Sequence, residues 1–384
     1  MEMDKTPQAL LYLMRCALQN EKPQAIDGLD YDALYRLSAA HSVVAMTAMA
    51  LESGGLLTEE YANAACIKKW KDAKVKAIRK NILLDTEREQ ILQYFEEQGI
   101  WYMPLKGSVL KDLYPRMGMR QMADNDILFD PVYQHQVKAY MESRGYEAIS
   151  FAIGNHDVYE KPPVYNFELH TSLFDEYLYE EWAAHYENIR IRLNKDPNNG
   201  YGYHFGDEDF YVYFLCHGYK HYCIGGTGIR FLADIYVFLR EKSDSMDWEY
   251  VKRELDKLKI YEFETATREL AEKLFGADNY DLAGEEEKIL GYLMGSGTYG
   301  TMENRVNREL DEIQKSEGPV TGWTKFRYTW KRLFPDKEFM KAYRPFLREH
   351  EWAIPFFWIY RIVRGFILRG KQIRRELHII NKTE

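Results

Sequence analysis

The chain has 384 residues, of which 46% are apolar and 15% aromatic, and this composition excludes an intrinsically disordered protein. Its formal net charge of −9 is uneven, because residues 321–384 carry 15 Lys and Arg against 6 Asp and Glu, whereas the remaining 320 residues carry 36 against 54. The acidic body disfavours non-specific binding to nucleic acid, while the basic C-terminal segment leaves room for one anionic partner.

Three sequence features concern the cellular compartment. Four cysteines in a chain of this length do not suggest a disulfide scaffold. The N-terminus starts with acidic residues and lacks the long apolar run of a signal peptide. No uncharged apolar run reaches the ~20 residues that cross a bilayer. We therefore expect a cytoplasmic protein with no transmembrane segment.

The first hundred residues have a helical pattern. Apolar residues at helical spacing predict a helix over 6–20, one or two helices over 30–55, and one long helix over 59–98 that closes at Gly99. His41 lies on an apolar face of this region, where a histidine is more often a hydrogen-bonded core residue than a ligand. This region, residues 1–81, is expected to form an N-terminal helical part.

From Gly99 onward the pattern becomes mixed. The predicted elements, in chain order, are a strand over 100–105, a helix beginning near Ser108, a strand over 124–130, a helix over 131–146, and strands over 147–151 and 164–174. We therefore expect a small α/β domain over residues 82–205.

The rest of the chain, residues 206–384, is predicted to be helical. The expected helices cover 208–223, 228–241, 247–258, 260–275, 285–296 and 301–316. An aromatic and basic tail follows. The tail is expected to pack on the body, with an anionic membrane surface or nucleic acid as alternative contacts.

Two aspartates stand one residue apart on the predicted strand 124–130. Because side chains alternate along a strand, Asp124 and Asp126 should share one face and Asn125 should point the other way. Glu168 is a third carboxylate, on another predicted strand. Three convergent carboxylates suit the binding of two hard cations such as Mg²⁺, which is the arrangement used for in-line phosphoryl or nucleotidyl displacement.

A Gly-Ser turn precedes these carboxylates. Gly107 and Ser108 lead into a helix N-terminus, where backbone N–H groups favour a phosphate. Lys106 could add a positive charge there or could be a solvated turn residue. Arg120 could also contact the nucleotide, or could pair with an aspartate for structural reasons.

A second polar cluster lies on the predicted helix 208–223. His217 and His221 share one helix face, but the flanking cysteines do not match a closed zinc pattern. His217, Lys220 and His221 could line the cleft beside the α/β domain, with Arg230 on the next helix. They could instead tie two helices together.

The motifs PLKGSVLKDLYP, Arg120, DNDILF and FELH resemble the uncharacterised nucleotidyltransferase family of the DNA polymerase β superfamily. The similarity is expected to extend into residues 216–239 and 333–347. The resemblance implies an α+β fold, in which a minimal nucleotidyltransferase core with a small mixed sheet is flanked by N- and C-terminal helical regions.

The resemblance also implies an activity. It predicts an enzyme that uses Mg²⁺ or Mn²⁺ to transfer a nucleoside monophosphate from a nucleoside triphosphate such as ATP to an acceptor hydroxyl. The acceptor could be a small molecule, a protein or an RNA 3′ end, although nucleic acid is not favoured. The expected site residues are Asp124, Asp126 and Glu168 for metal and catalysis, Lys106, Gly107, Ser108 and Arg120 for the nucleotide, and His170, His217, Lys220, His221 and Arg230 for the substrate cleft. The alternative is a non-catalytic protein of the same fold that senses a nucleotide or docks a partner.

Overall fold

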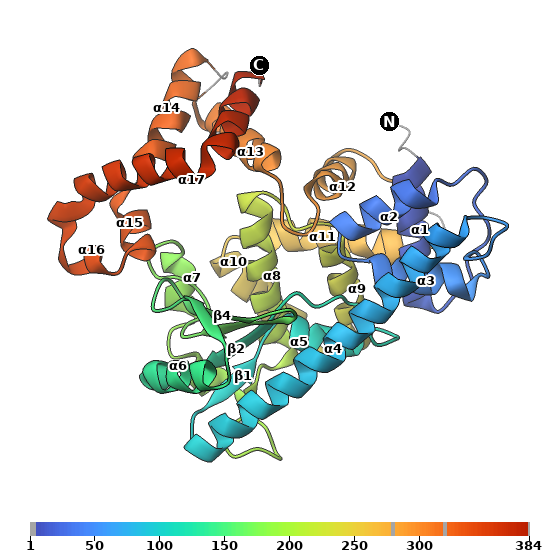
Figure 1. The fold of residues 1–384 in the computed structure, drawn as a ribbon, viewed down its shortest axis with the longest axis horizontal. Helices are drawn as coiled ribbons and strands as arrows, with labels where there is room; N and C mark the ends of the chain where they lie inside the picture. The colour runs from blue at the N-terminus through green and yellow to red at the C-terminus, as the bar shows by residue number, and fades with distance from the viewer. Residues whose placement is uncertain (1–4, 278–280, 318–320, 383–384) are drawn as a thin grey trace.

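The computed structural model describes residues 5–277, 281–317 and 321–382. Four helices form its N-terminal part (Figure 1): α1 (Lys5–Gln19), α2 (Tyr31–Ala40), α3 (Val44–Ser53) and α4 (Ala64–Gln98). Helix α4 begins where the Asn63 side chain accepts from the backbone N–H of Cys66, and it ends at Gly99 in the left-handed conformation, with φ of 70°. The expected helices are confirmed, and α4 begins five residues later than predicted.

A five-stranded mixed sheet follows α4. Its strands are β1 (Tyr102–Pro104), β2 (Asn125–Phe129), β3 (Glu147–Ser150), β4 (His156–Lys161) and β5 (Tyr165–His170), in the spatial order β1-β2-β5-β4-β3. Strands β2 and β5 are parallel, whereas the other neighbours are antiparallel. The intervening elements are α5 (Gly107–Leu110), η1 (Lys111–Leu113), η2 (Pro131–Tyr133) and α6 (Gln134–Ser143).

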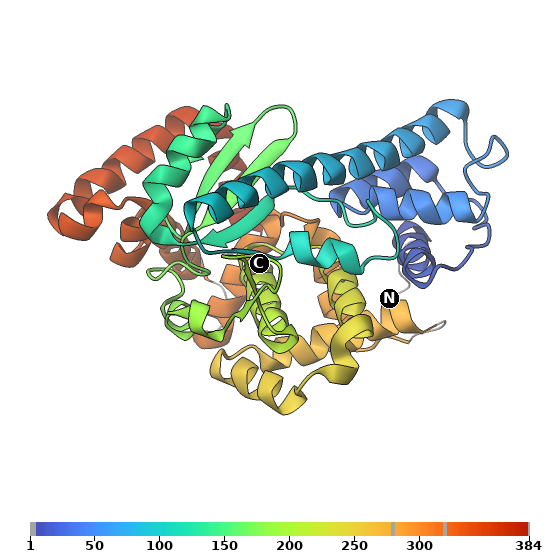
Figure 2. The ribbon, with the colours of Figure 1, turned by 90° about the horizontal axis from the view of Figure 1, so that it is seen from below.

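The two faces of the sheet have different surroundings. Ile127, Phe167 and Leu169 point to one face, where they form a buried cluster with Ile91 and Phe95 of α4 and with residues of α6. Figure 2 shows α4 running across the sheet. Asp126, Glu168 and His170 alternate with these apolar residues and therefore lie on the other face.

The helices after the sheet cover that second face and join the N-terminal helices. After α7 (Glu180–His185), η3 (Ile189–Arg192), β6 (Asn194–Lys195) and β7 (Tyr203–His204) come α8 (Asp207–Ile224), α9 (Arg230–Lys242), η4 (Ser243–Ser245), α10 (Trp248–Lys257), α11 (Tyr261–Gly276) and α12 (Glu285–Ser296). Their buried residues belong to the same core cluster as α1–α3.

The last helices form an arm. They are α13 (Met302–Glu317), α14 (Gly322–Leu333), α15 (Lys337–Tyr343), α16 (Phe346–Glu349), η5 (Glu351–Ala353) and α17 (Ile354–Lys382), which has a break at Arg369. In Figure 1 the arm occupies the upper left and bends back toward α7. Arg348 of α16 lies 4.7 Å from the centre of the Tyr177 ring in the segment before α7.

The fold class is confirmed as α+β, with a small mixed sheet and helical flanks. Strand β4 was not predicted from the sequence. The three-part division of the chain stays a prediction, and its boundary at 81/82 lies inside α4. Among the described residues, no helix has the length and apolar character needed to cross a membrane.

Candidate active site

The centre of the candidate site is a pair of carboxylates on adjacent parallel strands. Asp126 of β2 is in register with Glu168 of β5, so both side chains leave the sheet on the same face. Asn125 points the opposite way, where it accepts from Arg88 at 2.9 Å and donates to the carbonyl of Leu84 at 3.0 Å. Strand alternation therefore places Asp126 toward the site and Asn125 toward α4, as predicted.

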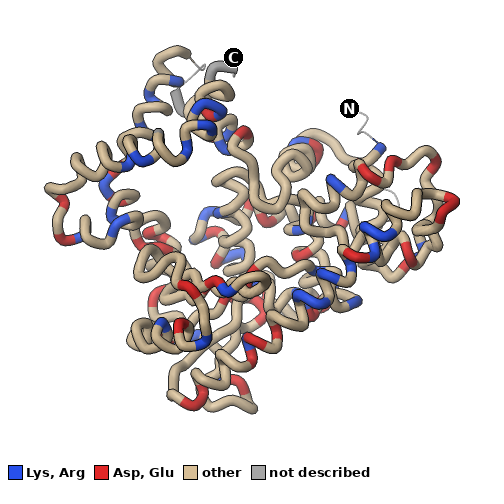
Figure 3. The backbone as a smooth tube through the Cα atoms, in the orientation of Figure 1, with Lys and Arg blue, Asp and Glu red and all other residues tan. Residues whose placement is uncertain are grey.

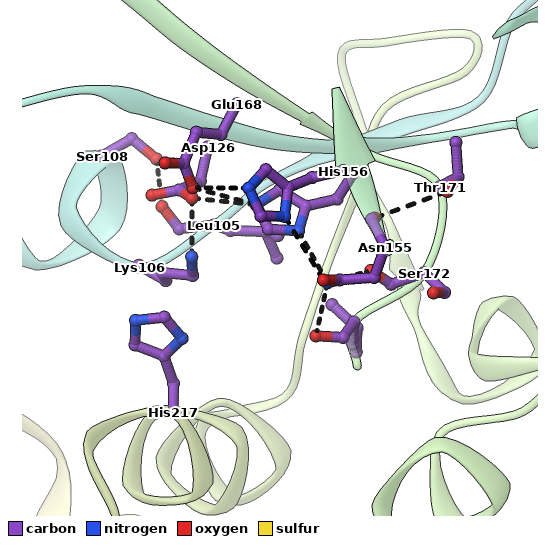
Figure 4. Close-up of polar contacts among 12 residues, drawn as sticks. Leu105, Lys106, Ser108, Asp126, Asn155, His156, Glu168, Thr171, Ser172 and His217 are labelled. Atoms are coloured by element: carbon purple, nitrogen blue, oxygen red, sulfur yellow. Dashed lines mark hydrogen bonds and ion pairs between the residues drawn. The ribbon is translucent and has the colours of Figure 1, made fainter. Parts of the chain in front are cut away.

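Two cationic or polar donors hold the buried Asp126 carboxylate. The Lys106 Nζ atom donates to Asp126 Oδ1 at 2.6 Å, and His170 Nε2 donates to the same oxygen at 2.9 Å (Figure 4). Burial alone would raise the pKa of Asp126, but the Lys106 ammonium and His170 outweigh it and hold that pKa well below its usual range. Asp126 is therefore ionised at neutral pH.

The pKa of Glu168 is shifted in the opposite direction to that of Asp126. Burial, followed by the negative charge of Asp126, raises the pKa of Glu168 to about 8. Asp124 lies half-buried just before β2, and its pKa is also raised, by burial and then by Asp126. Like charges in a partly desolvated space disfavour joint ionisation. The three carboxylates therefore carry less than their full negative charge at neutral pH.

The predicted phosphate turn has structural contacts of its own. Lys106 adopts a positive φ of 48° before the four-residue helix α5. The Ser108 hydroxyl donates to the carbonyl of Leu105 at 2.7 Å. A Cβ at position 107 would collide with the Arg120 guanidinium, so Gly107 permits the close approach of that side chain. Both residues therefore shape the turn, and their contact with a nucleotide stays a prediction.

Arg120 is paired with a buried aspartate. Its Nε and Nη2 atoms donate to Asp234 Oδ1 and Oδ2 at 2.7 and 3.0 Å, and the Tyr114 hydroxyl donates to Oδ1 at 2.7 Å. Such a bidentate pair fixes the guanidinium. This geometry matches the structural alternative considered for Arg120 in the sequence. The predicted nucleotide contact gains no support from it.

The polar cluster of α8 faces the carboxylates. Figure 4 shows His217 pointing from α8 toward Lys106. Burial and then the charge of Lys106 lower the pKa of Lys220 to about 8, while the charges of Glu168 and Asp126 act to raise it. His217 and His221 lie with their Nε2 atoms 3.0 Å apart. Burial and then Lys220 lower the pKa of His221 to about 3.

Arg230 lies at the margin of this group. Its Nη1 atom donates to the carbonyl of Gln121 at 2.9 Å, and its charge acts to lower the pKa of Asp124. Among the residues predicted to line the cleft, His170 contacts Asp126 directly, and the role of the others in a substrate cleft stays a prediction.

His156 was missed by the sequence analysis. It stands on β4, and a ligand atom from each of His156, Glu168 and His170 lies within 4.8 Å of the other two. Burial and then His170 lower the pKa of His156 to about 3, so its imidazole is neutral and able to bind a metal. The only sequence signal was a histidine in an alternating stretch just before β5.

The residues present fit a divalent cation. Asp126 and Glu168 supply hard oxygen donors of the kind that Mg²⁺ and Mn²⁺ prefer, and a cation would remove the repulsion that adds to burial in raising the Glu168 pKa. The neighbouring imidazoles of His156 and His170 would favour Mn²⁺ more than Mg²⁺, because nitrogen ligands suit transition metals.

A cavity of about 770 Å³ begins next to this group. It is lined by Thr171 and Ser172, which directly follow His170, and by Phe174, Glu176 and Arg190. Its size is typical of small-molecule sites.

The comparison with known families agrees with this geometry. A family described as uncharacterised nucleotidyltransferase matches residues 27–276. The chain belongs to this family. The matched range contains the sheet, all three carboxylates and helices α8 and α9, but it ends before residues 333–347, so the expected similarity there lies outside it. The searches of curated proteins and of solved structures found no match.

Membership of this family identifies the chain as a nucleotidyltransferase. The name of the family specifies no metal, nucleotide or acceptor.

Proposed function

We propose that this nucleotidyltransferase depends on Mg²⁺ or Mn²⁺ and transfers a nucleoside monophosphate to an acceptor hydroxyl. The observation that supports this most is the register of Asp126 with Glu168 on adjacent parallel strands, with Asp124 just before β2. This arrangement sends two carboxylates, Asp126 and Glu168, from the sheet on one face, and the approach of Asp124 to them is part of the proposal. ATP as the nucleotide and the cytoplasm as the location remain predictions.

Asp124 and Asp126 would hold both metal ions, and Glu168 would either hold the second ion or activate the acceptor hydroxyl. When bound, the ions would supply positive charge beside the phosphates and stabilise the negative charge that develops on the departing pyrophosphate.

The cationic side chains around the carboxylates would bind the triphosphate. Lys106 lies next to Asp126, and Lys220 faces the same space from α8. Because the pKa of Lys220 is lowered to about 8, an approaching phosphate would restore its full positive charge. His217 and His221 would donate hydrogen bonds from the same helix.

In the alternative role, in which Glu168 does not bind metal, its ionised carboxylate would accept the proton of the acceptor hydroxyl. The acceptor oxygen forms a bond to the α-phosphorus, the bond from that phosphorus to the pyrophosphate oxygen breaks, and the hydroxyl proton moves to the carboxylate. A carboxyl group with a pKa near neutrality suits this exchange. The cavity beyond Thr171 and Ser172 offers room for a small acceptor.

One observation favours the non-catalytic alternative. The Lys106 ammonium pairs with Asp126 at 2.6 Å, so this carboxylate has a positive partner within the chain itself. A nucleotide sensor would use the same cations to bind phosphates and would release no pyrophosphate.

Pyrophosphate release tests the proposal. The purified chain is incubated with each common nucleoside triphosphate, Mg²⁺ or Mn²⁺, and pools of small molecules, RNA or proteins, and binding is followed by thermal shift. The test variant is Glu168→Gln, and its control is Glu160→Gln on the exposed end of neighbouring β4.

We expect metal-dependent release from wild type and the control, and none from Glu168→Gln. Equal metal and nucleotide responses from all three proteins would refute the site. Metal-dependent nucleotide binding without release in any pool would favour the sensor.

A further inference from the structure

The first half of α17 carries an apolar stripe that no other part of the described chain covers. Phe356, Ile359, Val363 and Ile367 follow one another at spacings of three or four residues, so they share one helix face. All four side chains are more than half exposed, and Ile367 reaches 75%.

The opposite face of the same helix is occupied. Ile354, Phe357 and Trp358 pack with Met340 and Leu347 of α15 and α16 in a small core cluster. The stripe is therefore a second apolar face of a helix that has already buried its first one. Single exposed apolar residues are normal, but a continuous row of them marks a binding surface.

The segment that carries the stripe is also basic, with Arg364 and Arg369 exposed, whereas Arg361 donates to the carbonyls of Arg332 and Leu333 on the packed side of the helix. Residues 352–369 contain Arg361, Arg364 and Arg369 and no acidic residue. Figure 3 shows Lys and Arg recurring along the arm, in contrast to the acidic side chains in the segments around the sheet. The occupant of this surface should therefore combine apolar and anionic groups.

Helix α14 has a second stripe of the same chemistry. Trp323, Phe326 and Trp330 form a row of neighbouring rings on its surface, the first pair stacked at 5.4 Å between centroids and the second tilted at 5.9 Å. Trp323 is 67% exposed. Lys325 and Lys331 lie on the same helix.

Two other occupants fit less well. Bases of single-stranded nucleic acid stack on flat rings, yet Ile359, Val363 and Ile367 present branched aliphatic groups. A second copy of the chain, joined by a two-fold axis, would bring the basic stripe against itself. An anionic bilayer offers acyl chains to the apolar stripe and negatively charged headgroups to the exposed arginines beside it.

We propose that α17, assisted by α14, docks the protein on the surface of an anionic lipid bilayer. The apolar stripe lies among the acyl chains just below the headgroups, and the exposed Arg364 and Arg369 contact lipid phosphates. The helix lies along the surface and does not cross it. This inference is independent of the proposed nucleotidyl transfer.

The test is flotation of the full chain with vesicles of phosphatidylcholine, with or without phosphatidylglycerol. The disrupting variant is Val363→Asp. Its matched control is Val75→Asp on α4, because the two valines are 53% and 58% exposed and both lie within helices. Ile367→Asp is a second disrupting variant, and circular dichroism confirms that each variant is folded.

We expect binding to the anionic vesicles alone, weakened by added salt. Val363→Asp and Ile367→Asp should each lower the partition coefficient roughly tenfold, and Arg364→Gln about fivefold. The Val75→Asp control should bind like wild type.

Several results would overturn the proposal. These are no binding to either vesicle, equal binding to both, or equal loss in the Val75→Asp control. Tight binding of single-stranded RNA that the α17 variants abolish would assign the surface to nucleic acid instead. A dimer in solution that Val363→Asp converts to a monomer would assign it to a second copy of the chain.

Discussion

Replacing Glu168 by glutamine removes the ionisable group while keeping the size and shape of the side chain, so it isolates the effect of the Glu168 charge on folding stability. Glutamine has the shape of the protonated side chain, and Glu168 is largely protonated at neutral pH because its pKa is raised from 4.5 to about 8. In the unfolded chain the carboxyl ionises near 4.5, so wild-type stability is fully present below that pH and falls as pH rises toward 8. The glutamine variant has no such loss.

The size of this stability loss follows from the pKa shift of Glu168. A rise of about 3.5 pKa units corresponds to about 5 kcal/mol of stability in total, at about 1.4 kcal/mol per unit. Roughly 3 kcal/mol of this loss falls between about pH 6 and about pH 9. The side chain is 26% exposed, so solvent screening makes this an upper value.

The assay is denaturant unfolding of wild type, Glu168→Gln and the Glu160→Gln control, in the presence of a chelator, across that pH range. The stability gain of Glu168→Gln over wild type should grow as pH rises, and the control should follow wild type. Adding Mg²⁺ should stabilise wild type and leave Glu168→Gln nearly unchanged. Parallel pH curves for all three proteins would refute the reasoning, because Glu168 would then titrate as an ordinary surface carboxylate.

Three further outcomes are expected. Asp126→Asn should destabilise the metal-free protein by about 3–5 kcal/mol, because it leaves the Lys106 ammonium buried without its carboxylate, and it should abolish the thermal shift with Mg²⁺; an unchanged unfolding midpoint would contradict this. Metal affinity measured by calorimetry should rise by up to about tenfold per pH unit until about pH 8, because Glu168 must lose its proton to bind, and a flat profile would argue against Glu168 as a ligand. Asp234→Asn should lower the free energy of unfolding by about 3–5 kcal/mol, because it leaves the buried Arg120 guanidinium without its carboxylate, and nucleotide affinity should not change. A variant with unchanged stability and lower nucleotide affinity would instead support the predicted contact of Arg120 with the nucleotide.

The sequence predicts those helices and strands whose formation depends on residues close together in the chain. The helices α8 to α13 are predicted to within two residues at each end, because each combines apolar periodicity with clear terminal signals. The direction of Asp126 and Asn125 also follows from strand alternation alone. The shared face of Asp126 and Glu168 agrees with this alternation, whereas the approach of Asp124 to them stays a prediction.

Features that depend on distant partners were not predictable in this way. Strand β4 contains several charged residues and precedes two prolines, and it is held by pairing with both β3 and β5. Missing it also meant missing His156. The pairing of Arg120 with Asp234 joins residues 114 positions apart, so the sequence left its role open between nucleotide and structure.

The continuity of α4 restricts how the enzyme can move. This 35-residue helix is about 52 Å long, and its two halves belong to different hydrophobic clusters. Its first half packs with the N-terminal helices, which share a core with α8, and its second half packs on the sheet. Swinging the sheet away from α8 would require α4 to bend or one of these clusters to open. The proposed site between the sheet and α8 should therefore be preorganised, and nucleotide binding should leave the radius of gyration measured by small-angle X-ray scattering nearly unchanged.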